Sequence, residues 1–332
     1  MLTLDNKFHR IGAGLSVPSN PQGIRQPQWI KRNKSLAESL RISPQIFLDD
    51  DGLNILSGRK ILPGSNPVAQ AYAGHQFGKF NPFLGDGRSV LLGELATAVG
   101  SIDLALKGSG KTPFTFSSHG RATLSCCLHE YSISEQLAAH GIPTTRCLSI
   151  IAGSDQLYQN GRSERVGVLA RTAPSFVRFG SFEACYFRRD IAALTTLADY
   201  VIKHHFPNLL VDSTNPQTKY ALFFQEVVTR TATLIASWQN TGFVHGMMNT
   251  DNLSIVGVTL DLGSSQFIEP RDDSYVASAI DHTGRYAFGA QPVVGLWSCN
   301  VLAKALSPLV AEEKLTQSLM KYEANFLKHL NS

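Results

Sequence analysis

The sequence has little cysteine, little charge and no long apolar run. Five cysteines occur in 332 residues, and no two of them have Cys-x-x-Cys spacing. No apolar stretch reaches the about 18 residues that a membrane-spanning helix needs, and the first residues lack the charged-then-apolar pattern of a secretory signal. We therefore expect a cytoplasmic protein with reduced thiols and no membrane partner.

Charged residues make up only 17% of the chain, and 30 basic residues against 26 acidic ones leave a net charge of +4. This excess is too small to indicate a nucleic-acid partner, although a local cationic site for a phosphate ligand would account for part of it. The apolar share is 43%. A chain of this length and composition can bury a sizeable core and form two lobes.

Three side chains suited to a hard cation occur close together in the second half of the chain. Asp251 and Asn252 are adjacent, and Asp261 follows at the start of Asp-Leu-Gly. Mg²⁺ is usually held by one or two carboxylates and an amide, with phosphate oxygens completing its shell. We expect residues 253–260 to form two short strands that hold these groups apart. The alternative is a pair of ordinary surface turns, which Asp and Asn also favour.

A second set of residues upstream resembles the nucleotide-contacting part of protein kinases. A glycine-rich turn, Gly85–Arg88, precedes a predicted strand. Period-2 spacing then places Lys107 on the polar face of the next strand, and Glu130 lies on a predicted helix that ends near Gly141. A strand lysine paired with a helix glutamate positions the phosphates in kinases. Taken singly, Lys107 and Glu130 could instead be a solvated lysine and a surface-helix glutamate.

Arg171 and Arg178 flank Pro174, which prevents a regular helix through this segment. Guanidinium groups match phosphate oxygens bidentately and stay charged at any working pH. The pair suggests a phosphate clamp, with surface salt bridges as the alternative.

The rest of the second half is predicted to be mainly helical. Apolar residues at helical spacing run from Ile191 to Ile202, and an aromatic stripe runs from Tyr220 to Trp238 with Gly242 as its stop. The second helix would lead directly into His245, which we expect to anchor the following loop through both ring nitrogens.

Longer motifs carry a resemblance to a known family. The sequence resembles the selenoprotein O family, also called the YdiU family, in these segments: Tyr72–Gly78, Leu84–Arg88, Leu106–Gly110, Gly141–Arg146, Ala173–Gly180 and Asp281–Phe288. The resemblance runs from about residue 8 to about residue 310. Adjacent Asp251 and Asn252 also favour this family over conventional kinases, in which the base precedes the metal-binding Asn by several residues.

The resemblance implies an α+β, two-lobed, protein-kinase-like fold, with a sheet-containing N-lobe and a mainly helical C-lobe. From the prolines and the weak periodicity of residues 1–66 we expect an extended strap packed on the first lobe, with 67–150 as the N-lobe and 151–332 as the C-lobe. The resemblance also implies a protein adenylyltransferase, which transfers AMP from ATP to Ser, Thr or Tyr hydroxyls of protein substrates. Mg²⁺ is the expected cation, with Mn²⁺ as the alternative.

The resemblance assigns roles residue by residue. Asp251 would be the general base, and Asn252 and Asp261 the metal ligands, with Asp261 also contacting the nucleotide. The nucleotide-binding positions would be Gly85, Gly87, Arg88, Lys107, Gly120, Arg171 and Arg178.

Two departures from the family pattern leave the function open. The family usually has Gly-Asp-Gly-Arg where this chain has Ser118–Arg121, so His119 replaces an acidic residue. The family commonly continues beyond the position of Ser332 to a redox Cys pair, so we expect a shortened C-lobe without that element. The alternatives are therefore a catalytically silent nucleotide-binding pseudokinase and a conventional phosphotransferase.

Overall fold

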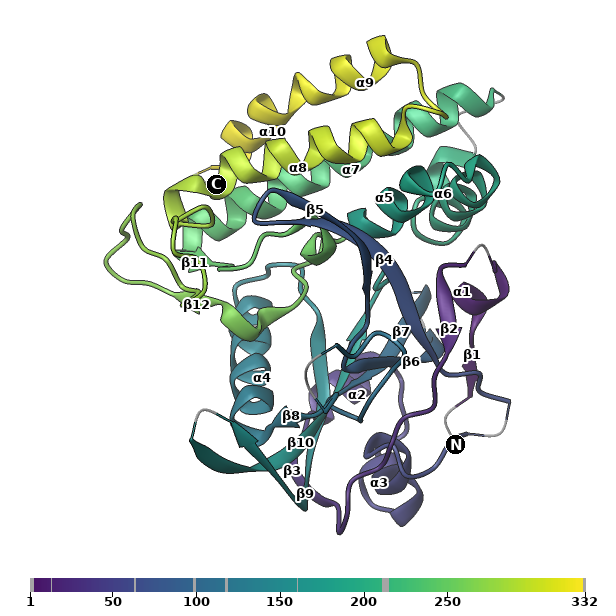
Figure 1. The fold of residues 1–332 in the computed structure, drawn as a ribbon, viewed down its shortest axis with the longest axis vertical. Coiled ribbons are helices and arrows are strands. Elements are labelled where there is room, and N and C mark those ends of the chain that lie inside the picture. Colours follow the sequence, from purple (N-terminus) through teal and green to yellow (C-terminus); the bar gives the residue numbers. More distant parts are fainter. Residues whose placement is uncertain are drawn as a thin grey trace. The chain divides into compact units, whose positions relative to one another are not determined.

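The computed structural model describes residues 3–12, 14–62, 64–97, 100–116, 119–159, 161–210 and 215–330. The chain divides into two compact units. Unit 1 consists of residues 1–71, 84–136 and 145–174, and unit 2 of residues 72–83, 137–144 and 175–332. Within the described residues the fold is α+β, as predicted, and its large antiparallel sheet and helices are consistent with a two-lobed kinase-like fold (Figure 1).

The strands are short at the N-terminus and long in the middle of the chain. Their bounds are β1 Leu4–Asp5, β2 Ser16–Pro18, β3 Gln28–Arg32, β4 Val68–Gln76, β5 Lys79–Gly85, β6 Ser89–Thr97, β7 Gly100–Lys107, β8 Ala122–Thr123, β9 Arg146–Gln159, β10 Arg162–Ala173, β11 Phe243–Val244 and β12 Gln266–Phe267. The main sheet has the order β2-β4-β6-β7-β10-β9-β3, with β1, β5 and β8 attached to β6, β4 and β10. Residues far apart in the sequence therefore become neighbours on one sheet.

The helices gather in the second half of the chain. Their bounds are α1 Lys7–Arg10, α2 Lys34–Ser39, α3 Asp50–Leu56, α4 Leu124–Ala139, α5 Phe179–Phe187, α6 Ile191–His205, α7 Pro216–Thr241, α8 Gln291–Leu306, α9 Glu312–Leu319 and α10 Lys321–His329. In unit 2, α8, α9 and α10 all pack on α7 (Figure 1). Among the helices described, none combines the length and the apolar character that crossing a bilayer requires.

The two predicted helices of the second half are confirmed. Asp190 caps α6, its side chain accepting from the Ala193 N–H, and the helix ends before Pro207. The aromatic stripe of α7 is buried from Tyr220 to Trp238. Gly242 ends α7 with a φ of 70°, a left-handed conformation that glycine adopts without strain.

Unit 1 builds its core on both faces of the sheet. On one face, Leu104 and Leu106 of β7 and Val168 of β10 join the apolar residues of α2 and α3 in one cluster. On the other face, Leu169 packs with Cys127 of α4. The two faces differ because side chains alternate along each strand.

Three predictions about local structure were wrong. Residues 151–173 begin no helical region, since β9 and β10 pair there as an antiparallel hairpin. Residues 253–260 form no two-stranded hairpin but a tight turn with an isolated bridge between Leu253 and Thr259. The first 66 residues are more than an extended strap, because they contribute α1 to α3 and strands β1, β2 and β3 to the sheet. The domain boundaries drawn from the sequence stay a prediction.

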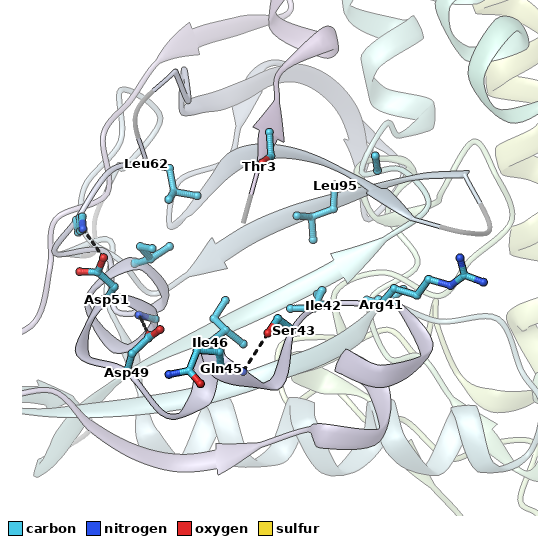
Figure 2. A pocket seen from close by; sticks show the side chains of 15 residues that line it. Thr3, Arg41, Ile42, Ser43, Gln45, Ile46, Asp49, Asp51, Leu62 and Leu95 are labelled. Carbon is cyan, nitrogen blue, oxygen red and sulfur yellow. Dashed lines mark hydrogen bonds and ion pairs between the residues drawn. The ribbon is translucent and has the colours of Figure 1, made fainter. Parts of the chain in front are cut away.

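A pocket of about 460 Å³ opens in unit 1 between the segment from Leu40 to Ile55 and strand β6 (Figure 2). Its wall is mostly apolar, and Asp51 at its edge pairs with Lys60 at 2.7 Å. None of the nucleotide or metal residues predicted from the sequence is among its lining residues.

All five cysteines are free thiols. Burial raises the pKa of Cys147, Cys185 and Cys299 to about 12, and raises that of Cys127 well above its ordinary value. The pKa of Cys126 is also raised, by burial and by the nearby Glu130 carboxylate.

Candidate functional site

In unit 1 the predicted lysine and glutamate form a buried ion pair. Lys107 ends β7, and the Nζ atom lies 2.5 Å from Oε1 of Glu130 on α4. Both residues are buried, with 4% and 2% of their surface exposed. Neither is the solvated surface residue that the alternative interpretation required.

Sheet register adds an arginine to this pair. Ala105 of β7 is opposite Arg171 of β10, so Arg171 shares the face on which Lys107 lies. One guanidinium nitrogen of Arg171 lies 3.9 Å from Glu130 Oε2, and another donates to Ser89 Oγ at 3.2 Å. Arg171 is 2% exposed. Arg171 therefore pairs with a buried carboxylate and does not form the surface salt bridge that was the alternative.

The charge state of Glu130 follows from these neighbours. Burial raises the pKa of Glu130, but the positive charges of Lys107 and Arg171 outweigh burial and leave the pKa below its usual value. The carboxylate is therefore ionised at neutral pH. Glu130 thus holds two buried cations in place, and lysine and arginine are the side chains that suit phosphate oxygens.

The glycine turn is confirmed between β5 and β6. Gly85 ends β5 and Arg88 precedes β6, with Arg88 exposed and close enough to Glu130 to help lower its pKa. A Cβ on Gly85 would come within 2.2 Å of the Phe114 ring, and one on Gly87 within 2.9 Å of the Phe114 carbonyl oxygen. The loop that carries Phe114 thus packs directly on the turn, and larger residues would displace it.

Gly120 has a structural reason to be glycine. It has a φ of 65°, and a Cβ there would lie 2.1 Å from the Gly110 carbonyl oxygen. The neighbouring Arg121 donates to the carbonyls of Gln22 and Gly23. His119 is exposed, and Ser118 lies outside the described residues.

In unit 2 Arg178 joins the two predicted acidic residues. Its Nη1 donates to Asp261 Oδ2 at 2.6 Å and to the backbone oxygen of Asp251 at 2.6 Å. The guanidinium carbon lies 4.8 Å from the centre of the Tyr72 ring, and Arg178 is 3% exposed. The three residues therefore occupy one place, although 83 positions separate Arg178 from Asp261.

Asp251 is a buried carboxylic acid with an incomplete set of partners. Its Oδ2 accepts from Gln76 Nε2 at 3.3 Å, whereas Oδ1 is buried and has no hydrogen-bond partner among the described residues. Burial raises the pKa of Asp251 to about 6, although the nearby charge of Arg178 lowers it in part. Such a group changes protonation state near neutral pH, as a general base must.

Two oxygen donors near Asp251 fit a magnesium ion. Asn252 donates its amide nitrogen to the Met247 carbonyl at 2.9 Å, which leaves its side-chain oxygen available as a ligand. Asp261 has a φ of 56°, a left-handed conformation that non-glycine residues rarely adopt, and its side chain is 23% exposed. Within the described part of the chain, no three His, Cys, Asp or Glu side chains gather to hold a metal by themselves. A cation here would take one amide, one carboxylate and phosphate oxygens.

His245 anchors the loop through both ring nitrogens, as predicted. The Nε2 atom lies 2.8 Å from the Leu260 carbonyl oxygen, and the Met247 N–H donates to Nδ1 at 3.3 Å. Burial lowers the pKa of His245, so the ring is neutral and bridges the two segments that carry Asp251 and Asp261.

The segment from Tyr72 to Gly78, to which no role was assigned from the sequence, supports the Asp251 loop. The His75 N–H donates to Thr250 Oγ1 at 2.7 Å, and the Phe77 N–H donates to Asn249 Oδ1 at 3.1 Å. Gly74 lies so close that a Cβ there would come within 2.8 Å of Asp251 Oδ1. The glycine within a long motif was the available signal, since it marks a close approach of backbone to another group.

The predicted site residues thus fall into two groups. Lys107, Arg171, Gly85, Gly87, Arg88 and Gly120 belong to unit 1, and Arg178, Asp251, Asn252 and Asp261 belong to unit 2. Each group contains direct contacts between residues distant in sequence. Their roles toward a nucleotide stay a prediction.

Comparison with known proteins agrees with the resemblance seen in the sequence. A family model described as "Protein adenylyltransferase SelO" matches residues 1–332. A protein nucleotidyltransferase YdiU of Enterobacter sp. (strain 638) is 42% identical over 323 residues, covering 97% of this chain and 66% of that protein. YdiU of Clostridium perfringens is 45% identical over 310 residues, covering 93% of this chain and 61% of that protein.

The chain therefore spans slightly less than two thirds of the length of these curated relatives. YdiU of Myxococcus xanthus is 40% identical over 329 residues, or 99% of this chain and 66% of that protein. The full-length family match and these identities lead to one conclusion: the chain belongs to the SelO/YdiU family.

Proposed function

We propose that this protein is a protein adenylyltransferase that uses ATP and transfers AMP to hydroxyl groups of protein substrates. The description of the matching family supports this activity, as do the names of the relatives. The observation that carries the proposal is Asp251, a buried acid with a pKa of about 6 and one oxygen without a partner among the described residues. An approaching hydroxyl would supply the missing hydrogen bond.

In this proposal Asp251 acts as the general base. Its Oδ1 accepts the proton of a Ser, Thr or Tyr hydroxyl while that oxygen bonds to the α-phosphorus of ATP. The bond from the α-phosphorus to the bridging oxygen breaks, and pyrophosphate leaves with the electron pair. Gln76, bonded to Oδ2, holds the carboxylate in place and leaves the other oxygen to receive the proton.

The cationic residues act on the phosphates. Lys107 and Arg171, both held by Glu130, would counter the charge that develops on the phosphate tail. Arg178 would do the same beside Asp261. Mg²⁺, held by Asn252 and Asp261, would supply further positive charge for the leaving pyrophosphate.

We further propose that the protein works in the cytoplasm. All five thiols are free and have raised pKa values, which suits a reducing compartment.

The experiment that tests the activity labels ATP separately at the α- and γ-phosphates. Purified protein is incubated with Mg²⁺ and a general acceptor such as casein, and the acceptor is analysed by intact mass. Addition of AMP, with label only from the α-phosphate, is the expected result. Addition of phosphate from the γ-position would instead identify a phosphotransferase, and ATP binding without transfer would identify a silent nucleotide-binding module. Asp251→Asn serves as the matched inactive control.

A further inference from the structure

Unit 2 contains a second built site beside the Asp251 loop. A pocket of about 800 Å³ is lined by the tip of the β4–β5 hairpin, the end of α5 and one face of α8, with His75, Glu183 and Trp297 among its residues. Ligand pockets in proteins commonly have volumes of about 300–1,000 Å³. The pocket therefore has room for several residues of an extended peptide.

One of the residues that line the pocket is a buried carboxylate with a spare acceptor. Glu183 is 3% exposed, and its Oε2 lies 2.5 Å from His75 Nδ1. Its other oxygen, Oε1, is buried and has no hydrogen-bond partner among the described residues. A buried acceptor without a hydrogen bond destabilises the protein. A ligand that donates a hydrogen bond to this oxygen would remove that cost, and the bond would add to its binding free energy.

The walls of the pocket are aromatic. Phe80 lies 5.1 Å from the His75 ring and 5.2 Å from the Phe187 ring, measured between ring centres. Trp297 meets His75 edge-on at 5.4 Å. Phe80 and Phe187 are 38% and 49% exposed. Rings at this spacing favour a further aromatic side chain in offset or edge-to-face contact.

The rim of the pocket is basic. Arg189 and Lys304 are both exposed, and among the described residues neither has an ion-pair partner. A ligand segment with acidic residues beside its aromatic one would match this charge.

Two adjacent residues of β4 contact the pocket and Asp251. His75 lines the pocket, and the next residue, Gln76, donates to Asp251 Oδ2. Successive side chains of a strand point to opposite faces, so the two contacts lie back to back on β4. A peptide held in the pocket would have to pass around β4 to bring a neighbouring residue to the proposed base.

We propose that this pocket binds the acceptor protein, through an aromatic side chain that carries a hydrogen-bond donor, as tyrosine does, next to acidic residues. The ring lies against Phe80, Phe187 and Trp297, and the hydroxyl donates to Glu183 Oε1. Acidic neighbours meet Arg189 and Lys304. This inference rests on the proposed function, because it assigns the pocket to the substrate of the same reaction.

The test uses defined probes. Three fluorescein-labelled peptides, Asp-Glu-Xaa-Ser-Gly with Tyr, Phe or Ala as Xaa, are titrated with the protein and followed by fluorescence anisotropy. We expect the Tyr peptide to bind about tenfold more tightly than the Phe peptide, the difference that a bond to a charged group provides. The Ala peptide should bind more weakly than either.

Two variants identify the pocket. Glu183→Gln removes the charge that strengthens the bond and should reduce the preference for Tyr over Phe to threefold or less, while Glu312→Gln on the exposed start of α9 should preserve it. Lys304→Glu should weaken the binding of all three acidic peptides by about tenfold, and Lys314→Glu should not. Circular dichroism melting confirms that each variant is folded, and Glu183→Asp provides a second variant if the glutamine is unstable.

Equal affinity for the three peptides, no binding up to millimolar concentration, or an unchanged Tyr preference in folded Glu183→Gln would each overturn the inference. ATP binding and AMP transfer to casein are measured on the same preparation. Peptide binding with no AMP transfer would refute only the proposed function. AMP transfer without peptide selectivity would refute only the assignment of the pocket to the acceptor protein.

Discussion

The Lys107 group of unit 1 and the Asp251 group of unit 2 handle buried charge in opposite ways. In unit 1, Glu130 is satisfied by Lys107 at 2.5 Å and by Arg171, and its pKa is lowered. In unit 2, Asp251 keeps one oxygen without a partner among the described residues, and burial raises its pKa to about 6. The first arrangement fixes cations in position in advance, and the second leaves an acceptor for a proton that arrives with the substrate.

The largest effect should come from Asp261→Ala. This change removes a carboxylate from the proposed cation and also the partner of Arg178 at 2.6 Å. We expect Mg²⁺-dependent ATP binding and AMP transfer to fall below detection, because the cation is left with too few ligands. Isothermal titration with ATP in the presence and absence of Mg²⁺ measures the loss. The matched control is Asp272→Ala, at an exposed aspartate. Full Mg²⁺-dependent activity in the Asp261→Ala variant would show that Asp261 is not a ligand of the cation.

Asp251→Asn should separate rate from stability. Removing a general base lowers the rate by about 10²–10⁴-fold. Because the folded protein holds the Asp251 proton more tightly than the unfolded chain, stability falls as pH rises from about 4 to about 6. The variant lacks this penalty and should be more stable at pH 7 by an amount on the order of 3 kcal/mol. Denaturant unfolding measures this difference.

The same carboxylate sets the pH dependence of the wild-type rate. AMP transfer should rise with pH as Asp251 loses its proton, with a midpoint near 6. Either a rate that is constant between pH 5 and 8, or an Asp251→Asn variant that is both active and less stable, would contradict the role of Asp251 as a base. The Asp251 group would then not differ in function from the Lys107 group.

Lys107→Ala tests the Lys107 group, in which the buried carboxylate of Glu130 has its ion-pair partners. Loss of one positioned cation should lower the rate by about 10²–10³-fold. Stability should fall as well, by about 3–5 kcal/mol, because the buried Glu130 loses its closest partner. The double variant Lys107→Met with Glu130→Gln should regain much of the stability but none of the rate. A wild-type rate in Lys107→Ala would exclude this residue from the site.

His245→Ala should have the smallest effect on chemistry. His245 joins the Met247 N–H to the Leu260 carbonyl, so its loss should cost about 2–4 kcal/mol of stability and only a modest factor in rate. Thermal melting together with the AMP-transfer rate measures both. An unchanged melting temperature would contradict the anchoring role.

Local signals in the sequence were sufficient for parts of this structure. Lys107 and Glu130 could be paired because a strand and a helix each have a clear period and stand in a known order. The α7 stripe ended at a glycine with φ of 70°. In these places one element's own residues determine its form, so no distant partner had to be known.

Other parts depend on partners that the sequence does not reveal. β9 and β10 were missed because their central residues, such as Ile150 and Leu169, are buried on both faces, which removes the alternation that marks a strand. The contact of Gln76 with Asp251 spans 175 positions, and no local pattern predicts it. The same holds for Glu183, whose unfilled acceptor is visible only once the aromatic rings around it are in place.

The raised pKa values of all five cysteines have a practical consequence for every experiment above. At neutral pH the native sulfurs remain as slow-reacting thiols, because reagents such as maleimides attack the thiolate. A single cysteine engineered on an exposed helix position would then react selectively with a fluorescent or spin label, without replacement of any native cysteine. The wild-type background is thus ready for distance measurements between labelled positions.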